Sequence, residues 1–192
     1  MKPTDPSPPP RRLSQVIAEI AVGAGERVSL ADLAAAVGDR SFAAIMILFA
    51  APNLLPMPPG ASTVFGIPLL LVAAQLAFGR QRIWLPEMIG RRSIGREAFA
   101  AVAAKLVPWL ERFERIARPR YWPASRALAD RYVGTLALAM AIVLIFPIPL
   151  GNWLPAVAVI LASLGLAERD GLWLGAGSAA ALASLVLVAA VV

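Results

Sequence analysis

The sequence predicts an all-α, polytopic membrane protein made of two related halves. Hydrophobic residues fill 59% of its 192 positions, whereas soluble domains hold roughly 45–50%. The excess gathers in long tracts without a charged residue, and a helix needs roughly 20 apolar residues to cross the hydrocarbon of a bilayer. The three uncharged tracts are Phe42–Gly79, Val133–Ala167 and Gly171–Val192.

The net charge of +6 is carried almost entirely by arginine. Basic residues beside apolar tracts are typical of cytoplasmic loops, and no nucleic-acid motif accompanies them. The pattern therefore favours a multi-pass membrane protein whose basic loops lie in the cytoplasm. The chain has no cysteine and no histidine, which excludes disulfides, Cys/His metal sites and Ser–His or Cys–His nucleophile pairs. We expect no catalytic residue, no cofactor and no metal.

The chain before the first tract predicts a tail followed by short helices. Residues 1–12 are proline-rich and predict a disordered tail, and no signal peptide is expected because no apolar core follows. Residues 13–192 form a single membrane domain. Leu13–Gly23 has one apolar stripe, typical of an amphipathic helix. A second short helix is expected after a cap at Ser29–Asp32, running to about Val37 with Gly38 as its stop. Both helices should lie on the membrane surface or pack on its cytoplasmic side.

The first uncharged tract predicts a helix, a break and a second helix. Four prolines fall within Pro52–Gly60, and each removes an N–H donor and clashes with the preceding turn. The first limb, Phe42–Ala51, would span only about 15 Å as a helix, which is half a bilayer. This limb is too short to cross, so a re-entrant segment or a short hairpin is expected.

A basic linker separates this tract from the next one. Arg80–Arg131 holds twelve Lys/Arg against five Asp/Glu. Within it, Glu97–Ala117 places apolar residues on one face and predicts an interfacial amphipathic helix. The apolar face consists of Phe99, Val102, Leu106, Leu110 and Phe113.

The second tract repeats the same design. Its break, Pro147–Asn152, separates the limbs Val133–Phe146 and Trp153–Ala167, which are also short for full crossings. The final tract, Gly171–Val192, is long enough to be a transmembrane helix. Its small residues, beginning with Gly175 and Gly177, form a face suited to packing within the chain or between two copies.

Five identities at a constant offset of 91 residues predict an internal repeat, covering about 39–79 and about 130–167 with the linker 80–129 between them. Charged residues, proline and glycine carry the match, so Leu/Ala-rich composition does not explain it. The matched pairs are Asp39 with Asp130, Arg40 with Arg131, Pro56 with Pro147, Pro58 with Pro149, and Gly60 with Gly151. Because the tail and linker are both basic, the rule of positive cytoplasmic loops favours a parallel orientation of the halves, although an inverted repeat is not excluded.

The two breaks are the candidate binding site. A broken helix leaves backbone groups without partners, and lipid cannot satisfy them, so paired breaks often mark transport sites. The alternative is an ordinary tight turn. Asn53 and Asn152 either line a site here or cap freed backbone groups. The candidate ligand-binding residues are therefore Asn53, Pro56, Pro58, Gly60, Pro147, Pro149, Gly151 and Asn152.

Two further groups of residues are candidates for contact with lipid. The charge pairs Asp39–Arg40 and Asp130–Arg131 either interact across the repeat or sit at the membrane edge with arginine reaching the headgroups. The arginines of the linker suit phosphate geometry and predict contact with anionic lipid or a lipid-linked sugar. This cluster comprises Arg80, Arg82, Arg91, Arg92 and Arg96. Gln75, deep in an apolar tract, is expected to form an interhelical hydrogen bond.

Ordered motifs along nearly the whole chain resemble the exopolysaccharide synthesis ExoD family. They run from Leu54-Leu-Pro56-x-Pro-Pro-Gly60 through Trp84-Leu-Pro86 to Pro147-x-Pro149-x-Gly151-Asn152 and Leu164-Gly-Leu-x-Glu168-Arg-Asp170-Gly171. The resemblance implies a bacterial inner-membrane protein linked to exopolysaccharide production and, in rhizobia, to host invasion. It implies no established biochemical activity.

Two functions follow from these patterns. The paired breaks favour a small transporter or a protein that handles a lipid or polysaccharide precursor. The basic linker favours instead a non-catalytic scaffold of the exopolysaccharide machinery. The partners expected are the lipid bilayer, anionic lipid or lipid-linked sugar, and a second copy of the chain, but no nucleic acid.

Overall fold

The computed structural model describes residues 12–23, 25–29, 36, 41–54, 61–84, 86, 93–122, 125–146 and 152–191. Over these residues the fold is almost entirely helical, which confirms the all-α class. The elements in order are α1 Leu13–Val22, β1 Arg27–Ser29, α3 Ser41–Ala50, η2 Ala51–Leu54, α4 Ala61–Ala77, β2 Ser93–Gly95, α6 Arg96–Ile116, α7 Arg126–Ile145, α8 Trp153–Glu168 and α9 Gly171–Val191. The second short helix predicted before Gly38 lies outside the described residues, apart from residue 36.

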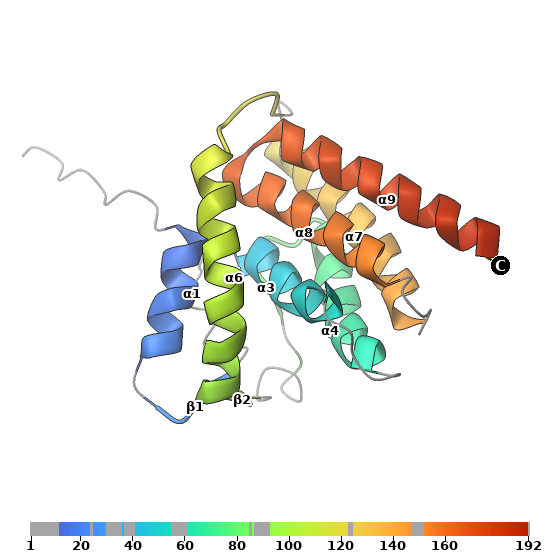
Figure 1. The fold of residues 1–192 in the computed structure, drawn as a ribbon. Helices are drawn as coiled ribbons and strands as arrows, with labels where there is room; N and C mark the ends of the chain where they lie inside the picture. Colours follow the sequence, from blue (N-terminus) through green and yellow to red (C-terminus); the bar gives the residue numbers. More distant parts are fainter. Residues whose placement is uncertain are drawn as a thin grey trace, which may run out of the picture.

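The helices α1 and α6 lie side by side and run crosswise to the other helices (Figure 1). The buried stripe of α1, which includes Leu13 and Ile17, packs on α6. Glu114 of α6 accepts hydrogen bonds from the backbone N–H and the hydroxyl of Ser14 at the start of α1. At the other end of the pair, β1 and β2 form a two-stranded antiparallel sheet that the sequence analysis did not predict.

The centre of the protein is α3, which has no exposed side. Every residue from Phe42 to Ala50 is buried, and α3 packs on both α4 and α8. A helix that is hydrophobic all round is expected to be enclosed. The short first limb of the first tract, which forms α3, is therefore enclosed by protein along its buried residues Phe42–Ala50.

The remaining helices form an antiparallel bundle around α3. At one end, the hydroxyl of Thr63 in α4 donates a hydrogen bond of 2.9 Å to the carbonyl of Ile145 in α7. At the other end, Gly134 of α7 lies against the backbone of Ala77 in α4. We call the first end the break end, because α4 and α8 begin there after the two proline-rich breaks. The opposite end, which includes Arg120 and Asp170, is called the charged end. In Figure 1, α3, α7 and α9 run toward the break end, and α4 and α8 run back.

Close backbone contact joins α9 to α8. A Cβ atom on Gly177 would stand 2.6 Å from the backbone nitrogen of Ala162 and 3.0 Å from the carbonyl oxygen of Ala158. Ala181 and Ser184 continue this buried face of α9. Part of the small-residue face thus packs within the chain. Gly175 belongs to a different side, where a Cβ atom would meet nothing within 4 Å.

Two helices of the described residues, α7 and α9, are long and apolar enough to cross a membrane. The final tract, Gly171–Val192, was expected to be long enough for a transmembrane helix, and the 21 residues of α9 agree with this. The limb expected at Val133–Phe146 was too short, because α7 begins seven residues earlier. Ser125 caps it by accepting a hydrogen bond from the backbone N–H of Leu128, and 20 residues of helix span about 30 Å.

Side-chain contacts decide two further expectations, on Gln75 and on the apolar stripe of α6. Gln75 was expected to bond another helix, but its amide donates to the carbonyl of Trp84 at 2.8 Å and accepts from the N–H of Trp84 at 2.7 Å. It therefore fixes the chain that follows α4. The apolar stripe of α6 is confirmed at Phe99 and Leu110, which are buried in the protein core.

The contrast between two glycines of α9 generates a stability prediction. Gly177→Ala should destabilise the protein by about 1–3 kcal/mol, because the new methyl group overlaps the α8 backbone. Gly175→Ala is the matched control and should be neutral or stabilising, since alanine favours helix and nothing opposes its Cβ. Thermal unfolding of the detergent-solubilised variants measures both. Equal thermal midpoints for Gly177→Ala and Gly175→Ala would contradict the packing of α8 on α9.

Candidate functional site at the helix breaks

The residues that flank the two breaks come together at the break end. The 3-10 helix η2, which carries Asn53, packs against α8. Asn152 directly precedes α8. The hydrogen bond between Thr63 and Ile145 joins the residues after the first break to those before the second. The amides of Asn53 and Asn152 therefore belong to the same end of the bundle.

Asn53 is only 7% exposed, and its amide orientation is determined by its neighbours. Its Nδ2 donates to the carbonyl oxygens of Phe49 at 3.1 Å and of Ala50 at 3.5 Å. This satisfies carbonyls at the end of α3, one of the two roles expected from the sequence. Its Oδ1 is buried and accepts no hydrogen bond within the structure as described.

Asn152 presents a second buried acceptor. Its carbonyl accepts the first hydrogen bond of α8, from the N–H of Ala156 at 3.2 Å. Its side chain does not cap the helix, and its Oδ1 has no partner among the residues described. The expected capping role is thus absent at this position, and the amide oxygen is left for another donor.

Ser184 of α9 adds a buried hydroxyl toward the break end of the bundle. It is 1% exposed, and its Oγ makes no hydrogen bond in the described part of the chain. Because α9 runs antiparallel to α8, with Gly177 against Ala162, Ser184 lies toward the start of α8. A buried polar atom without a partner costs about 1–3 kcal/mol, so each of these oxygens favours a donor group brought in from outside the described residues.

No charged residue borders these oxygens within the described segments 49–54, 61–65, 144–146 and 152–156. Acceptor oxygens in an uncharged setting bind hydroxyl and amide groups, and they disfavour anions. No group of three acidic side chains in the described residues is suited to a metal ion. The arrangement can recognise a neutral ligand that donates hydrogen bonds.

The structure brings together only part of the predicted site. Asp130 and Arg131 lie in the second turn of α7, at the charged end and away from the breaks. Arg131 is exposed, and its Nε is 3.2 Å from where a Cβ atom on Gly79 would stand. The other predicted residues lie outside the described residues. They are Asp39, Arg40, Pro56, Pro58, Gly60, Pro147, Pro149 and Gly151.

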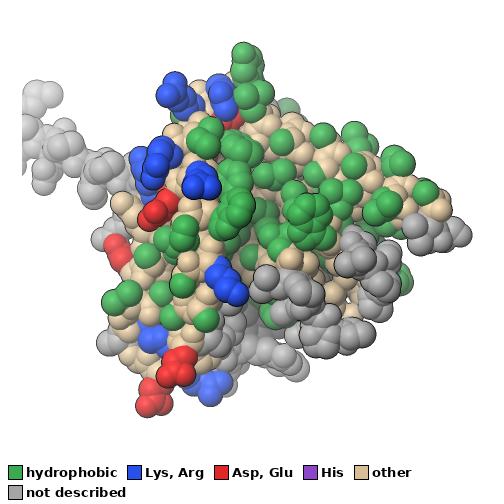
Figure 2. Space-filling model, viewed as in Figure 1, with side chains coloured by type: hydrophobic (Ala, Val, Ile, Leu, Met, Phe, Trp, Pro, Cys, Tyr) green, Lys and Arg blue, Asp and Glu red, His purple; other side chains and the backbone are tan. Residues whose placement is uncertain are grey.

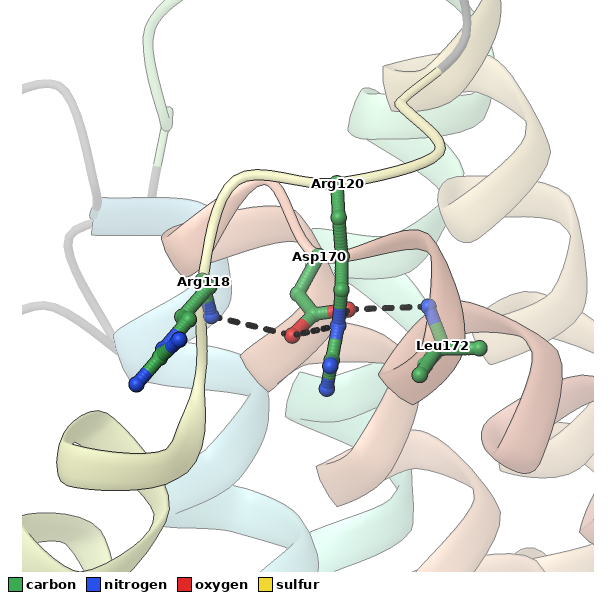
Figure 3. A network of polar contacts seen from close by, with 4 residues as sticks. All are labelled: Arg118, Arg120, Asp170 and Leu172. Atoms are coloured by element: carbon green, nitrogen blue, oxygen red, sulfur yellow. Dashed lines mark hydrogen bonds and ion pairs between the residues drawn. The ribbon is translucent and has the colours of Figure 1, made fainter.

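The charged end is organised by Asp170, a residue that stood out in the sequence only as a member of the family motif. Its carboxylate is 0% exposed and accepts from the N–H of Arg118 at 3.1 Å and from the N–H of Leu172 at 2.9 Å. The Nε of Arg120 lies 3.1 and 3.2 Å from its two oxygens. Figure 3 shows these groups converging from the segment that follows α6 and from the start of α9.

Opposing effects act on the pKa of the Asp170 carboxyl. Burial alone would raise it, but the hydrogen bonds from Arg120, Arg118 and Leu172, together with the charge of Arg120, outweigh burial. The pKa therefore lies below its ordinary value of 3.8. Asp170 ties the α6 segment to the α8–α9 corner as a carboxylate at neutral pH.

Comparison with known proteins identifies the family. The sequence pattern of the family described as "Exopolysaccharide synthesis, ExoD" matches residues 13–190. This chain belongs to the ExoD family. The match covers all the described helices except the last residue of α9. The resemblance found in the sequence motifs is therefore confirmed, and with it a role related to exopolysaccharide synthesis.

Two relatives match most of the chain. An uncharacterized protein of Synechocystis sp. is 37% identical over 155 residues, which cover 80% of this chain and 73% of the relative. Protein ExoD of Rhizobium meliloti is 34% identical over 158 residues, or 80% of this chain. The match spans 65% of the length of the Rhizobium protein, slightly under two thirds. No solved structure matches.

The Asp170 contacts predict a specific pH dependence. Because the folded pKa lies below the unfolded one, Asp170 contributes stability above pH 3.8, and this contribution disappears as pH falls through the lowered pKa. Asp170→Asn should therefore lower the thermal midpoint of the detergent-solubilised protein at pH 7, and the difference from wild type should shrink toward pH 3. A difference that is constant over this range would contradict the role of the carboxylate charge.

Proposed function

We propose that this ExoD family member is a multi-pass protein of the bacterial inner membrane that transports or handles a lipid or polysaccharide precursor at its two helix breaks. The observation that carries the proposal is the presence of two buried amide oxygens, on Asn53 and Asn152, without partners among the described residues at one uncharged end of the bundle. Acceptors of this kind suit the hydroxyl groups of a sugar.

The distribution of side chains supports insertion into a membrane. Charged residues gather over α1, α6 and the charged end, while the visible surface of α8 and α9 is apolar or backbone (Figure 2). Within the membrane-spanning window of α9, only 22% is buried inside the protein. Apolar patches larger than a few hundred Å² are rare on soluble monomers. The proposal places the charged end in the cytoplasm, as basic loops favour, with α1 and α6 along that interface.

The packing of the helices supports a repeat with its breaks side by side. The first limb of each half packs on the second limb of the other: α3 on α8, and α7 on α4. Within each half, α3 also contacts α4, and α7 contacts α8. These are the pairings that two equivalent, parallel halves would make, and the described residues that flank the two breaks lie at one end.

The alternative is a scaffold for the exopolysaccharide machinery. The charged surface over α1 and α6 favours it, because such a surface suits a protein partner (Figure 2). Arg96, a member of the basic cluster predicted to hold lipid, donates to the carbonyls of Gly25 and Ile20, so it has a structural role. Arg80 and Arg82 are exposed and are the residues through which a scaffold would dock.

The orientation is testable because the chain has no native cysteine. Phe146→Cys at the break end and Arg169→Cys at the charged end are both exposed positions separated by α8. A membrane-impermeant thiol reagent should label the first in intact spheroplasts and the second only in inverted vesicles. Labelling of both from the same side would contradict a crossing by α8.

The site is testable by removing its acceptors. Asn53→Leu and Asn152→Leu should each abolish exopolysaccharide output when they replace the wild-type gene in its host, while the protein remains at normal level in the membrane. The double charge reversal Arg80→Glu with Arg82→Glu is the matched control, and it should leave output intact. Loss with the charge reversal and retention with both asparagine variants would favour the scaffold instead.

A further inference from the structure

Ser184 carries the third buried oxygen of the break end, and its hydroxyl differs from others on the long apolar helices. The hydroxyl of Ser178 donates to the carbonyl of Leu174, four residues earlier, at 2.8 Å. The hydroxyl of Thr135 donates in the same way to the carbonyl of Arg131 at 2.8 Å. This local bond is the usual one for serine and threonine inside a helix. Ser184 is more deeply buried than either residue, yet its Oγ has no partner in the described part of the chain.

The contact between α8 and α9 fixes the level of Ser184 in the bundle. A Cβ atom on Gly177 would stand 2.6 Å from the backbone nitrogen of Ala162, and Ser184 is seven residues beyond Gly177. Because the two helices are antiparallel, Ser184 lies opposite Pro155, seven residues before Ala162. Pro155 belongs to the first turn of α8, which Asn152 directly precedes. The hydroxyl of Ser184 and the amide of Asn152 therefore both belong to the start of α8.

The apolar surface of α9 continues past this level. The helix ends at Val191, seven residues or about 10 Å beyond Ser184, and Figure 1 shows this end projecting past α8. Its last turns are apolar, and Val186 among them is 69% exposed. Exposed apolar surface of this kind is more stable in hydrocarbon than in water. In the membrane proposed above, the hydrocarbon beside α9 thus reaches past the buried oxygens.

The same helix gives the depth of these oxygens in the bilayer. Ser184 follows Gly171, the first residue of α9, by 13 residues or about 20 Å, and the hydrocarbon of a bilayer is about 30 Å thick. Ser184 therefore lies inside the hydrocarbon, and lipid tails cannot satisfy polar atoms at this depth. A free sugar stays in water, whereas the head of a membrane lipid can be drawn to this depth with its tail still in hydrocarbon.

The uncharged surroundings determine the sign of the head. The tracts Val133–Ala167 and Gly171–Val192 contain no charged side chain, and no cation is available to a phosphate or carboxylate among the residues described at the break end. A charge without a counter-ion is costly inside a membrane. Neutral hydroxyl groups need only the acceptor oxygens that are present. The break end therefore suits an uncharged head that carries hydroxyl groups.

Trp153 adds an aromatic surface at the same level. It is the first residue of α8, directly follows Asn152, and is 57% exposed. An indole ring has an apolar face and one N–H donor, and a sugar ring has both apolar C–H faces and hydroxyl groups. An exposed indole at the level of unpaired acceptor oxygens therefore favours a sugar over a simple alcohol such as diacylglycerol.

We propose that the break site binds the neutral sugar head of a glycolipid dissolved in the bilayer. The oxygens of Asn53, Asn152 and Ser184 accept hydrogen bonds from the sugar, and the ring of Trp153 packs on it. This inference rests on the proposed function and names the substrate class of the same site. The sugar is carried on an uncharged lipid, and neither a phosphate-linked sugar nor a free sugar is the preferred ligand.

The test is native mass spectrometry of the full-length protein released from nanodiscs. The nanodiscs contain monoglucosyl dioleoylglycerol, dioleoylglycerol and dioleoyl phosphatidylglycerol in equal amounts, and wild type should retain the glucolipid in preference to the other two. Ser184→Ala should weaken this retention by about tenfold, because one hydrogen bond to the sugar is lost. The same variant should keep or raise the thermal midpoint of the ligand-free protein, since it removes a buried hydroxyl that has no partner in the described structure.

Ser163→Ala is the matched control. It makes the same change at a serine of α8 that is 0% exposed and whose Oγ also lacks a partner among the described residues. Ser163 is 11 residues from Asn152, about 16 Å along the helix and away from the break end. Ser163→Ala should therefore retain the glucolipid as wild type does.

Several results would overturn the proposal. These are equal retention by Ser184→Ala and wild type, an equal loss with Ser163→Ala, and retention of phosphatidylglycerol or dioleoylglycerol as strong as that of the glucolipid. If Ser184→Ala lowers the thermal midpoint, Trp153→Ala, an exposed change, takes its place. Loss of exopolysaccharide output in the asparagine variants, with no glucolipid retained by wild type, would refute this inference and leave the proposed function standing. Release of the wild-type protein from membranes by alkaline carbonate would instead refute the proposed function itself.

Discussion

The enclosure of α3 is the constraint on which the rest of the fold depends. A helix of ten residues that is buried all round needs neighbours on every side, and α4 and α8 supply them. In turn, α7 packs closely on α4 at Gly134, and α9 packs closely on α8 at Gly177. The bundle is thus built outward from its shortest apolar helix, and its longest apolar helix, α9, is left at the periphery with most of its surface uncovered.

Small residues allow this compact arrangement. Gly134 lies against the backbone of Ala77, and Gly165 lies against the backbone of Leu174, where a Cβ atom would stand 2.6 Å from its nitrogen. In a membrane, packing of close-approaching helices replaces the hydrophobic driving force that operates in water. The low polarity of these helices then leaves few side chains able to recognise a ligand. The buried amides at the breaks are consequently the most informative polar groups in the bundle.

Patterning allowed much of the fold to be predicted. Alternation of charged and uncharged tracts located α4, α8 and α9, and the apolar stripes located α1 and α6. The start of α7 was missed because Arg126, Asp130 and Arg131 precede its apolar part, although they are all helical. The strands β1 and β2 have three residues each and pair over a separation of more than 60 residues, and no local pattern indicates such a contact.

The candidate site could be predicted only in part, for a similar reason. Asn53 and Asn152 stood out because amides are rare in apolar tracts, but the unpaired state of their oxygens depends on tertiary contacts. Asp170 and Arg120 are 50 residues apart. The family motif contains Asp170 but not its partners, and only the folded chain shows that the carboxylate joins α6 to α9.

The absence of side-chain charge at the break end has a consequence for how the protein is made. The two breaks, Pro52–Gly60 and Pro147–Asn152, contain no ionisable side chain. In the proposed orientation these are the segments that must pass through the bilayer when each helical pair inserts. Carrying a charged side chain into the bilayer centre costs about 2.5–3.5 kcal/mol on insertion scales. Each helical pair can therefore enter the membrane from the cytoplasmic side as a preformed hairpin, without moving a charge across and without drawing on the membrane potential.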